Sequence, residues 1–228
     1  MTLAEAAREK KWLHGIMLDK EQLIDLITQA FKETQHPGDA FLQGSQQGCE
    51  PAEVIAPFKG VNHWSEVDHA ILDPNESALS FFTEGGFRHF LPAFLIADIQ
   101  GRLQTADPVF HLTHGFIPEK TIEVPAGGRI HRRSTGKSTL INPKLYGAMT
   151  WHDHALQRLS AFTREEACAI VAYLEYRRDA DLHGINQVDI NAALDHFWRR
   201  RAEEAPTQDA LRRHLQAEAE YIKDLKAR

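Results

Sequence analysis

The stretch FFTEGGFRHFLPAFLIADIQGRL, residues 81–103, is the most apolar part of the chain and decides its fold class. Thr83 is suited to cap a helix. Five large apolar side chains follow at the spacing of one helix face: Phe87, Phe90, Leu91, Phe94 and Leu95. Pro92 lacks a backbone N–H donor, so we expect the helix to kink or to restart there. The stretch therefore predicts a pair of helices at the centre of a helical core.

Other segments also combine a capping residue with apolar residues at helical spacing. Asp19 and Thr163 are each expected to begin a long helix, and Ser65 and Asp73 to begin shorter ones. Two further helical stretches lie within residues 184–228. Together, helical patterns cover roughly half of the chain, well above the roughly one third that is usual in globular proteins.

The helical pattern is lost between residues 101 and 150. This segment is rich in Pro, Gly and β-branched residues, and only VFHL at 109–112 and TIEV at 121–124 are typical of strands. We therefore predict a mainly α fold, a multi-helix orthogonal bundle, with an irregular and short-stranded basic insertion over 101–150. The whole chain, 1–228, is expected to form a single domain, with 184–228 as a C-terminal helical extension.

The overall composition is that of a soluble protein. Hydrophobic residues make up 43% and charged residues 25% of the 228 residues. The formal net charge of −6 disfavours a dedicated nucleic-acid-binding protein, which usually carries a basic excess. No apolar run has the length of a signal peptide or of a membrane span. Neither Cys49 nor Cys168 lies in a setting that calls for a disulfide, so we expect a reduced, cytoplasmic location without a membrane partner.

The letters GKST at 136–139 resemble part of a phosphate-binding loop, but the surrounding sequence does not complete the motif. Such a loop requires a glycine five positions before Gly136, and that position is His131. The motif also requires an apolar strand before the loop, and GRIHRRS is not apolar. The sequence therefore does not indicate a nucleotide-binding loop.

The basic charge around GKST is more informative. No acidic residue lies between Glu123 and Asp153, whereas the same interval contains five basic residues: Arg129, Arg132, Arg133, Lys137 and Lys144. Such segregation suits a phosphate, a nucleic-acid backbone or an acidic protein surface. The candidate anion- or partner-binding residues are Arg129, Arg132, Arg133 and Lys137. The alternative is a solvated loop whose charges are balanced by the acidic helices of the same chain.

A metal site is a second candidate, because the chain contains 13 histidines. The densest groups are HLTH, with His111 and His114, and WHDH, with His152 and His154. If WHDH is a strand, His152 and His154 share a face and Asp153 lies on the other. Neither group has the spacing of a strong zinc signature, and the alternative is a set of ordinary surface or core histidines.

No pattern indicates a catalytic residue or a cofactor. The sequence has no G-x-S-x-G motif, and Cys168 lies in an apolar helical pattern that is typical of a core position. Glu165 and Glu166 are explained by the helix N-terminus at which they lie.

Three segments resemble a family of uncharacterised bacterial helical proteins with an LPAFL, FTxEE and FLEY-type signature. They are HWSEV at 63–67, ALSFFTEGGFRHFLPAFLIADI at 78–99 and AFTREEACAIVAYLEYRRD at 161–179. The resemblance implies a small helical bacterial domain and carries over no catalytic residue. It does not extend to the basic stretch or to the C-terminal helices.

Two functions follow from these patterns. The first is a cytoplasmic binding module, immunity-like or regulatory, that acts through contacts with a protein partner; nucleic acid is the less favoured partner, and no oligomeric state is indicated. The second is a hydrolase-type enzyme that binds an anionic substrate at the basic 129–144 stretch. That enzyme would use His111, His114, His152 or His154 for acid–base or metal chemistry.

Overall fold

The apolar stretch forms one long helix, α5 (Glu84–Ile99), in the computed structural model, which describes residues 18–118, 120–141 and 148–227. Thr83 caps this helix, since its side-chain oxygen accepts a hydrogen bond from the Gly86 amide at 2.9 Å. The helix runs through Pro92 without the expected restart, so one helix replaces the predicted pair. Thirteen of its 16 residues are buried, which places α5 at the centre of the core.

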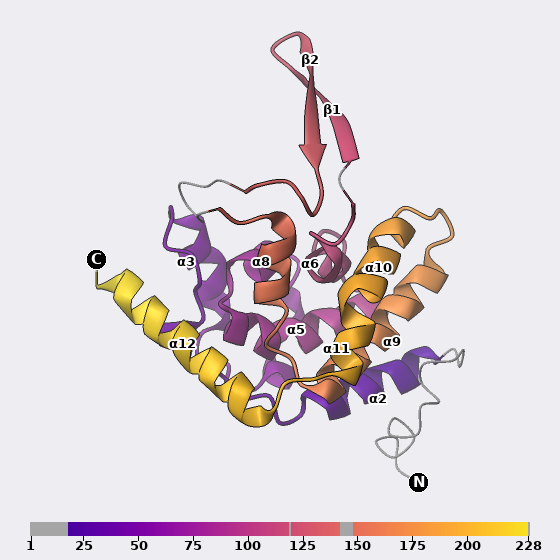
Figure 1. The fold of residues 1–228 in the computed structure, drawn as a ribbon. Helices are drawn as coiled ribbons and strands as arrows, with labels where there is room; N and C mark the ends of the chain where they lie inside the picture. Colours follow the sequence, from indigo (N-terminus) through magenta and orange to yellow (C-terminus); the bar gives the residue numbers. More distant parts are fainter. Residues whose placement is uncertain (1–17, 119, 142–147, 228) are drawn as a thin grey trace.

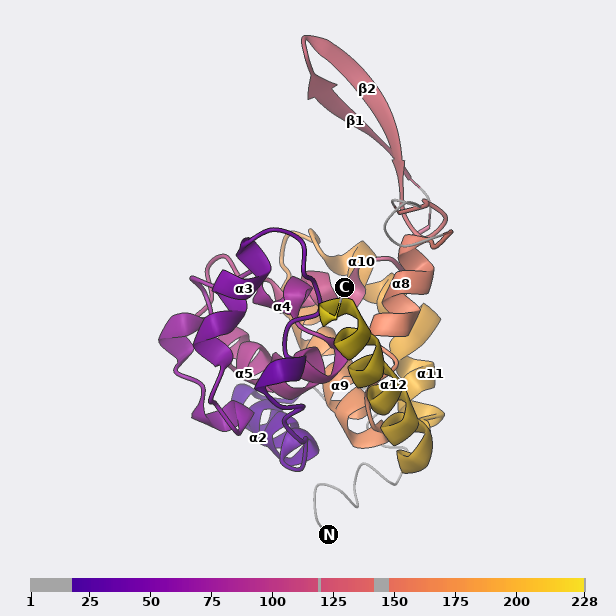
Figure 2. The same ribbon diagram turned by 90° about the vertical axis from the view of Figure 1, so that its left-hand side faces the viewer.

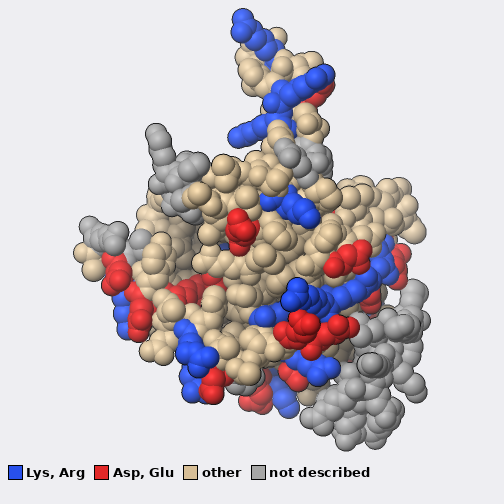
Figure 3. All heavy atoms as spheres, viewed as in Figure 1, with Lys and Arg blue, Asp and Glu red and all other residues tan. Residues whose placement is uncertain are grey.

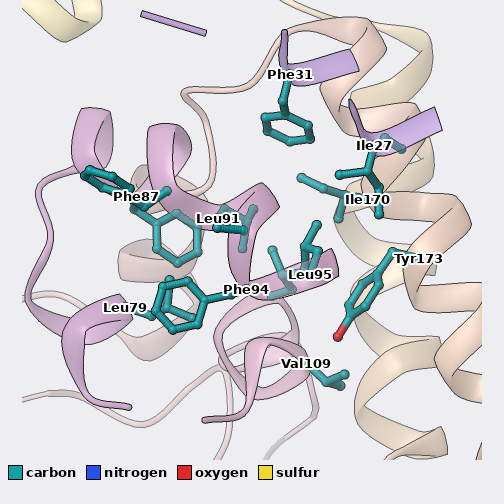
Figure 4. Close-up of a cluster of buried hydrophobic side chains, with 14 of the residues drawn as sticks. Ile27, Phe31, Leu79, Phe87, Leu91, Phe94, Leu95, Val109, Ile170 and Tyr173 are labelled. Carbon is teal, nitrogen blue, oxygen red and sulfur yellow. The ribbon is translucent and has the colours of Figure 1, made fainter. Parts of the chain in front are cut away.

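Helix α2 (Lys20–Phe31) packs against both α5 and α9 (Arg164–Ala180), which are labelled in Figure 1. Helices α2 and α9 each begin with a complete capping box, one at Asp19 and one at Thr163, which confirms the two predicted starts. Side chains from all three helices meet in the core, among them Phe31, Leu91 and Ile170 (Figure 4).

A buried carboxylate, that of Glu166, fixes these helices relative to one another. It accepts a hydrogen bond from the Thr34 hydroxyl at 2.6 Å, from Nε of Arg88 at 2.9 Å and from the Thr163 amide at 2.8 Å. At the other end of α5, the Tyr173 hydroxyl donates to Asp98 at 2.6 Å. Because the Arg88–Glu166 and Tyr173–Asp98 contacts each join α5 to α9, the register of α9 against α5 is set at both ends.

The segment between α2 and α5 is built from short elements, and the helices expected to begin at Ser65 and at Asp73 do not form. These elements are η2 (Asp39–Phe41), α3 (Glu50–Ile55), η3 (Ala56–Phe58), η4 (Trp64–Glu66), η5 (His69–Ile71) and α4 (Ala78–Phe81). Asp73 caps no helix. Its carboxylate instead accepts hydrogen bonds from the amides of Gln104, Thr105 and Ala106 at 3.0–3.1 Å, and so holds a distant loop in place.

The 101–150 segment contains helices as well as strands. The expected strand VFHL is helix α6 (Pro108–Thr113), because Asp107 caps it and proline occupies the first helical position. The expected strand TIEV lies within β1 (Lys120–Ala126), which pairs with β2 (Arg129–Thr135) in a two-stranded antiparallel sheet. Helix α8 (Trp151–Arg158) closes the segment. The fold is thus mainly α with a small antiparallel sheet.

The C-terminal region completes the core. It contains α10 (Gln187–Ala193), a π-helical turn at Leu194–Trp198, α11 (Arg199–Glu203) and α12 (Gln208–Lys226). The Trp198 side chain is fully buried, and its indole N–H donates to the carbonyl of Leu112 at 2.8 Å. Helix α12 lies along the outside of the body (Figures 1 and 2). None of the helices in the described part of the chain is both long enough and apolar enough to cross a bilayer.

Candidate functional site

Strands β1 and β2 form a hairpin, residues 120–135, that projects away from the helical body in both ribbon views (Figures 1 and 2); we call it the arm. Gly127 and Gly128 join the strands with φ of 57° and 71°. Positive φ at both positions is the requirement of a two-residue type I′ turn, which glycine meets without strain. Apart from Thr135, all residues of β2 are exposed, and Ile130 is 68% exposed. The arm therefore presents both of its faces to solvent.

The two faces of the arm differ in charge. Residues that oppose each other across the two strands share a face. One face, which we call the basic face, combines basic and apolar side chains: Arg129, His131, Arg133, Ile122, Val124 and Ala126. On the opposite face Arg132 lies across from Glu123, and Nε of Arg132 is 3.3 Å from Oε1 of Glu123. Glu123 is the only acidic residue within 120–135, so the basic face has no carboxylate of its own.

The four candidate binding residues are therefore only partly brought together. Arg129 and Arg133 share the basic face, and within the described residues neither forms an ion pair. Arg132 lies on the other face with Glu123. Lys137 is half-buried at the base of the arm, where its amide donates to the carbonyl of Ile117 at 2.9 Å. Basic side chains follow the arm in the space-filling view (Figure 3).

The GKST sequence forms part of this base and has none of the geometry of a phosphate-binding loop. Such a loop leads from a buried strand directly into a helix. Here the strand before Gly136 is exposed, and residues 137–138 form a turn in place of a helix. The amide of Trp151 instead donates to the carbonyl of Thr139 at 3.2 Å, which joins the base of the arm to α8.

The histidine groups lie in the body and do not form the expected pair. His152 and His154 belong to helix α8, so the prediction that they share the face of a strand is wrong. The His152 ring lies 5.7 Å from the Phe116 ring, whereas the His154 ring lies 6.1 Å from the Trp151 ring. His114 also packs against Trp151, with ring centroids 4.8 Å apart.

Burial makes three of these histidines poor bases. It lowers the pKa of His111 to about 3, with smaller effects from Arg158 and His114. Burial is also the main cause that lowers the pKa of His114 and of His154. Within the described ranges, no three His, Cys, Asp or Glu side chains are placed to hold a metal ion.

A second feature is a cavity of about 670 Å³ beneath α12, which the sequence did not indicate. It lies where α12 meets the N-terminus of α5 and the last turn of α8. Its charged lining comes from four side chains that are far apart in the sequence: Glu84, Arg158, His214 and Glu218.

These four groups are connected by short contacts. The Glu218 carboxylate accepts hydrogen bonds from the amides of Glu84 and of Gly85, the latter at 3.0 Å, so a residue of α12 caps the N-terminus of α5. The His214 ring contacts the carboxylate of Glu84. The Arg158 guanidinium donates to the carbonyls of Leu79 and Phe82 and lies 4.6 Å from the centre of the Phe87 ring.

Burial changes the acidity of this cluster. Desolvation, aided by the nearby Glu218 carboxylate, raises the pKa of Glu84 to about 7. Desolvation also raises the pKa of Glu218 and lowers the pKa of Arg158 to about 10. Glu84 therefore exchanges its proton near neutral pH. The cluster connects α12 to the body, and its charge changes near neutral pH because Glu84 loses its proton there.

Comparisons with protein-family models, with curated proteins and with solved structures each find no match to this chain. The function is therefore argued from the geometry of the arm and of the body.

Proposed function

We propose that the protein is a cytoplasmic binding module that holds an acidic surface of another protein with the basic face of its arm. The observation that carries this proposal is that Arg129 and Arg133 lie on the same face of β2, on either side of His131, exposed and without a carboxylate on that face. An immunity-like or regulatory role would use such a contact.

The exposure of the arm supports the same proposal. A lone two-stranded hairpin in water is marginally stable, because few of its side chains are buried. Ile130 is 68% and Ile122 37% exposed, so a partner that covers the arm would bury apolar surface on both of its faces. Burial of a fully exposed side chain of this size contributes about 1.5–3 kcal/mol, and burial of these two partly exposed side chains would contribute proportionally less. Ion pairs with the two arginines would also orient the partner and increase its association rate.

The hydrolase alternative has less support. It requires the basic residues and the histidines to converge on one substrate. Arg129 and Arg133 lie on the projecting arm, whereas His111, His114 and His154 lie in the body and have lowered pKa values. The two arginines of the basic face are thus in a different region from these three histidines.

The test compares two double variants in quantitative co-purification from extracts of the source cells. Arg129→Ala with Arg133→Ala removes the charge of the basic face. Glu123→Ala with Arg132→Ala removes an ion pair from the other face and leaves the net charge unchanged. Exposed ion pairs contribute about 0.2–1 kcal/mol each, so we expect the first variant to bind the partner about tenfold more weakly and the second to bind nearly normally.

Salt provides the second readout of the same experiment. Exposed charge pairs are screened at high ionic strength, so added salt should weaken wild-type binding towards the level of the Arg129/Arg133 variant. Equal losses of partner binding in the two double variants, or partner binding that does not depend on the salt concentration, would show that the basic face is not the contact.

A further inference from the structure

The outer edge of β2 carries backbone groups that no strand uses. Within the described residues the sheet has only two strands, so each has one free edge. The type I′ turn makes Ala126 and Arg129 a hydrogen-bonded pair, since the turn closes with a bond between these two residues. Hydrogen-bonded and non-hydrogen-bonded pairs then alternate along the ladder. Ile130 and Arg132 consequently direct both their N–H and C=O groups outward.

The edge of β1 is less suited to pairing. The same alternation directs Pro125 outward, opposite Ile130. Proline has no N–H, so at this position it costs the hairpin no ladder bond but removes a donor from the free edge. Proline on an edge strand is a common protection against pairing with other chains. The two edges therefore differ, and β2 has the open one.

We propose that the edge of β2 accepts an extended segment of the partner protein as a third strand, with acidic side chains at every second position. This inference rests on the proposed function and specifies how the partner binds. The added strand pairs its backbone with Ile130 and Arg132. Its residues opposite Arg129, His131 and Arg133 share the basic face, so carboxylates at those alternate positions meet the two arginines.

Charge argues against a second copy of this chain as the third strand. In antiparallel self-pairing centred on His131, each Arg129 opposes an Arg133. In the register centred on Arg132, two Arg132 side chains oppose each other. Like charges directly opposite each other destabilise a strand pair, so both registers are disfavoured.

The test uses a short blocked peptide of alternating glutamate and valine, added to the isotopically labelled full chain. We expect saturable binding together with slower hydrogen exchange of the Ile130 and Arg132 amides, because these amides become hydrogen-bonded in the added strand. A peptide of alternating lysine and valine serves as the control and should not bind. Binding of the acidic peptide without protection of these two amides would contradict strand addition.

Peptide chemistry provides a test that leaves the protein unchanged. Only one alternate set of peptide amides faces β2, so N-methylation of one set should abolish binding and N-methylation of the other set should not. Equal binding of both methylated peptides would overturn the inference.

Two substitutions examine the same edge from the protein side. Ile130→Pro removes an outward N–H from β2 and should reduce peptide binding at least tenfold, whereas Thr121→Pro on the edge of β1 should leave it unchanged. Equal effects of the two proline variants, in chains whose arm resonances are retained, would count against the edge of β2.

The outcomes separate this inference from the proposed function. If the methylated peptides bind equally while Arg129 and Arg133 are still needed for the protein partner, strand addition fails and the binding function stands. If mixed-sequence duplex DNA binds more tightly than the peptide, and this binding also requires Arg129 and Arg133, the arm is a nucleic-acid-binding element and both proposals are overturned.

Discussion

Glu84 and Glu218 show how two carboxylates of one cluster take different roles. Glu218 comes from α12 and caps α5 through the amides of Glu84 and Gly85. Glu84 begins α5 and contacts His214 of α12. Both groups are largely buried, and burial raises both pKa values. Between them they hold α12 against the body by polar contacts more than by apolar ones.

The raised pKa of Glu84 leads to a prediction about pH. Its pKa is about 7 in the folded protein against an ordinary value of 4.5 for glutamate, so folding favours the protonated form. The stabilisation by the proton is complete below pH 4.5 and is lost as the pH rises through 7. Glu84→Gln has no proton to lose. As the pH rises between these values, the free energy of unfolding of Glu84→Gln should therefore increase relative to that of the wild type, by on the order of 2–3 kcal/mol.

Urea denaturation of both proteins at pH 5 and at pH 8 measures this difference. A stability difference that is the same at the two pH values would show that Glu84 ionises normally in the folded protein.

Helix α12 is tied to the body by a small number of buried side chains and polar contacts. Leu211 and Ile222 are its buried apolar side chains in the described residues, and His214 and Glu218 supply the polar ties. Glu218→Ala removes the acceptor for two amides, which is comparable to the loss of a helix cap and costs about 0.5–2 kcal/mol. We expect hydrogen exchange in α12 to become about tenfold faster while that of α9 stays unchanged.

Glu204→Ala is the matched control, because Glu204 lies before α12 and takes part only in an exposed ion pair with Arg200. Its exchange rates should equal those of the wild type. Acceleration of α9 to the same extent as α12 in Glu218→Ala would indicate global destabilisation instead of local release of α12.

The sequence predicts a helix best where the residues that cap it lie close to it in the chain. The helices that start at Asp19, Thr83 and Thr163 are capped by side chains within three residues, so short patterns were sufficient. Local signals also existed for the two misassigned segments. Thr150 and Asp153 form a capping box at α8, and Asp107 with Pro108 begins α6. In the first segment the alternating histidines suggested a strand, and in the second the apolar and β-branched residues VFHL did.

The arm and the cluster beneath α12 also differ in whether a local sequence signal marks them. The arm follows from Gly127 and Gly128, a turn signal that the sequence contains, although β2 has no apolar alternation to mark it as a strand. The cluster beneath α12 has no local signal, since Glu84, Arg158 and Glu218 become neighbours only when α12 folds back onto the body. The division of the basic residues between two faces required the register of the strands, which the sequence did not predict.

At the scale of the whole molecule, the positive charge of the arm contrasts with an overall net charge of −6. Figure 3 shows basic side chains along the arm, while acidic and basic side chains are intermixed on the visible face of the body. In the proposed function, this separation would orient the molecule so that the arm approaches an acidic partner first. The proposed contact on the arm is separate from α12, so a change in the cluster beneath α12 should leave partner binding intact.

Site-specific cross-linking tests the central claim, that the arm makes the partner contact. A photoreactive amino acid is placed at Ile130 on the arm or at Val188 on α10, which is 67% exposed on the body, and the cells are irradiated. We expect a discrete adduct with another protein from position 130 that disappears when Arg129 and Arg133 are both replaced by alanine. An adduct from position 188 with none from position 130 would contradict it.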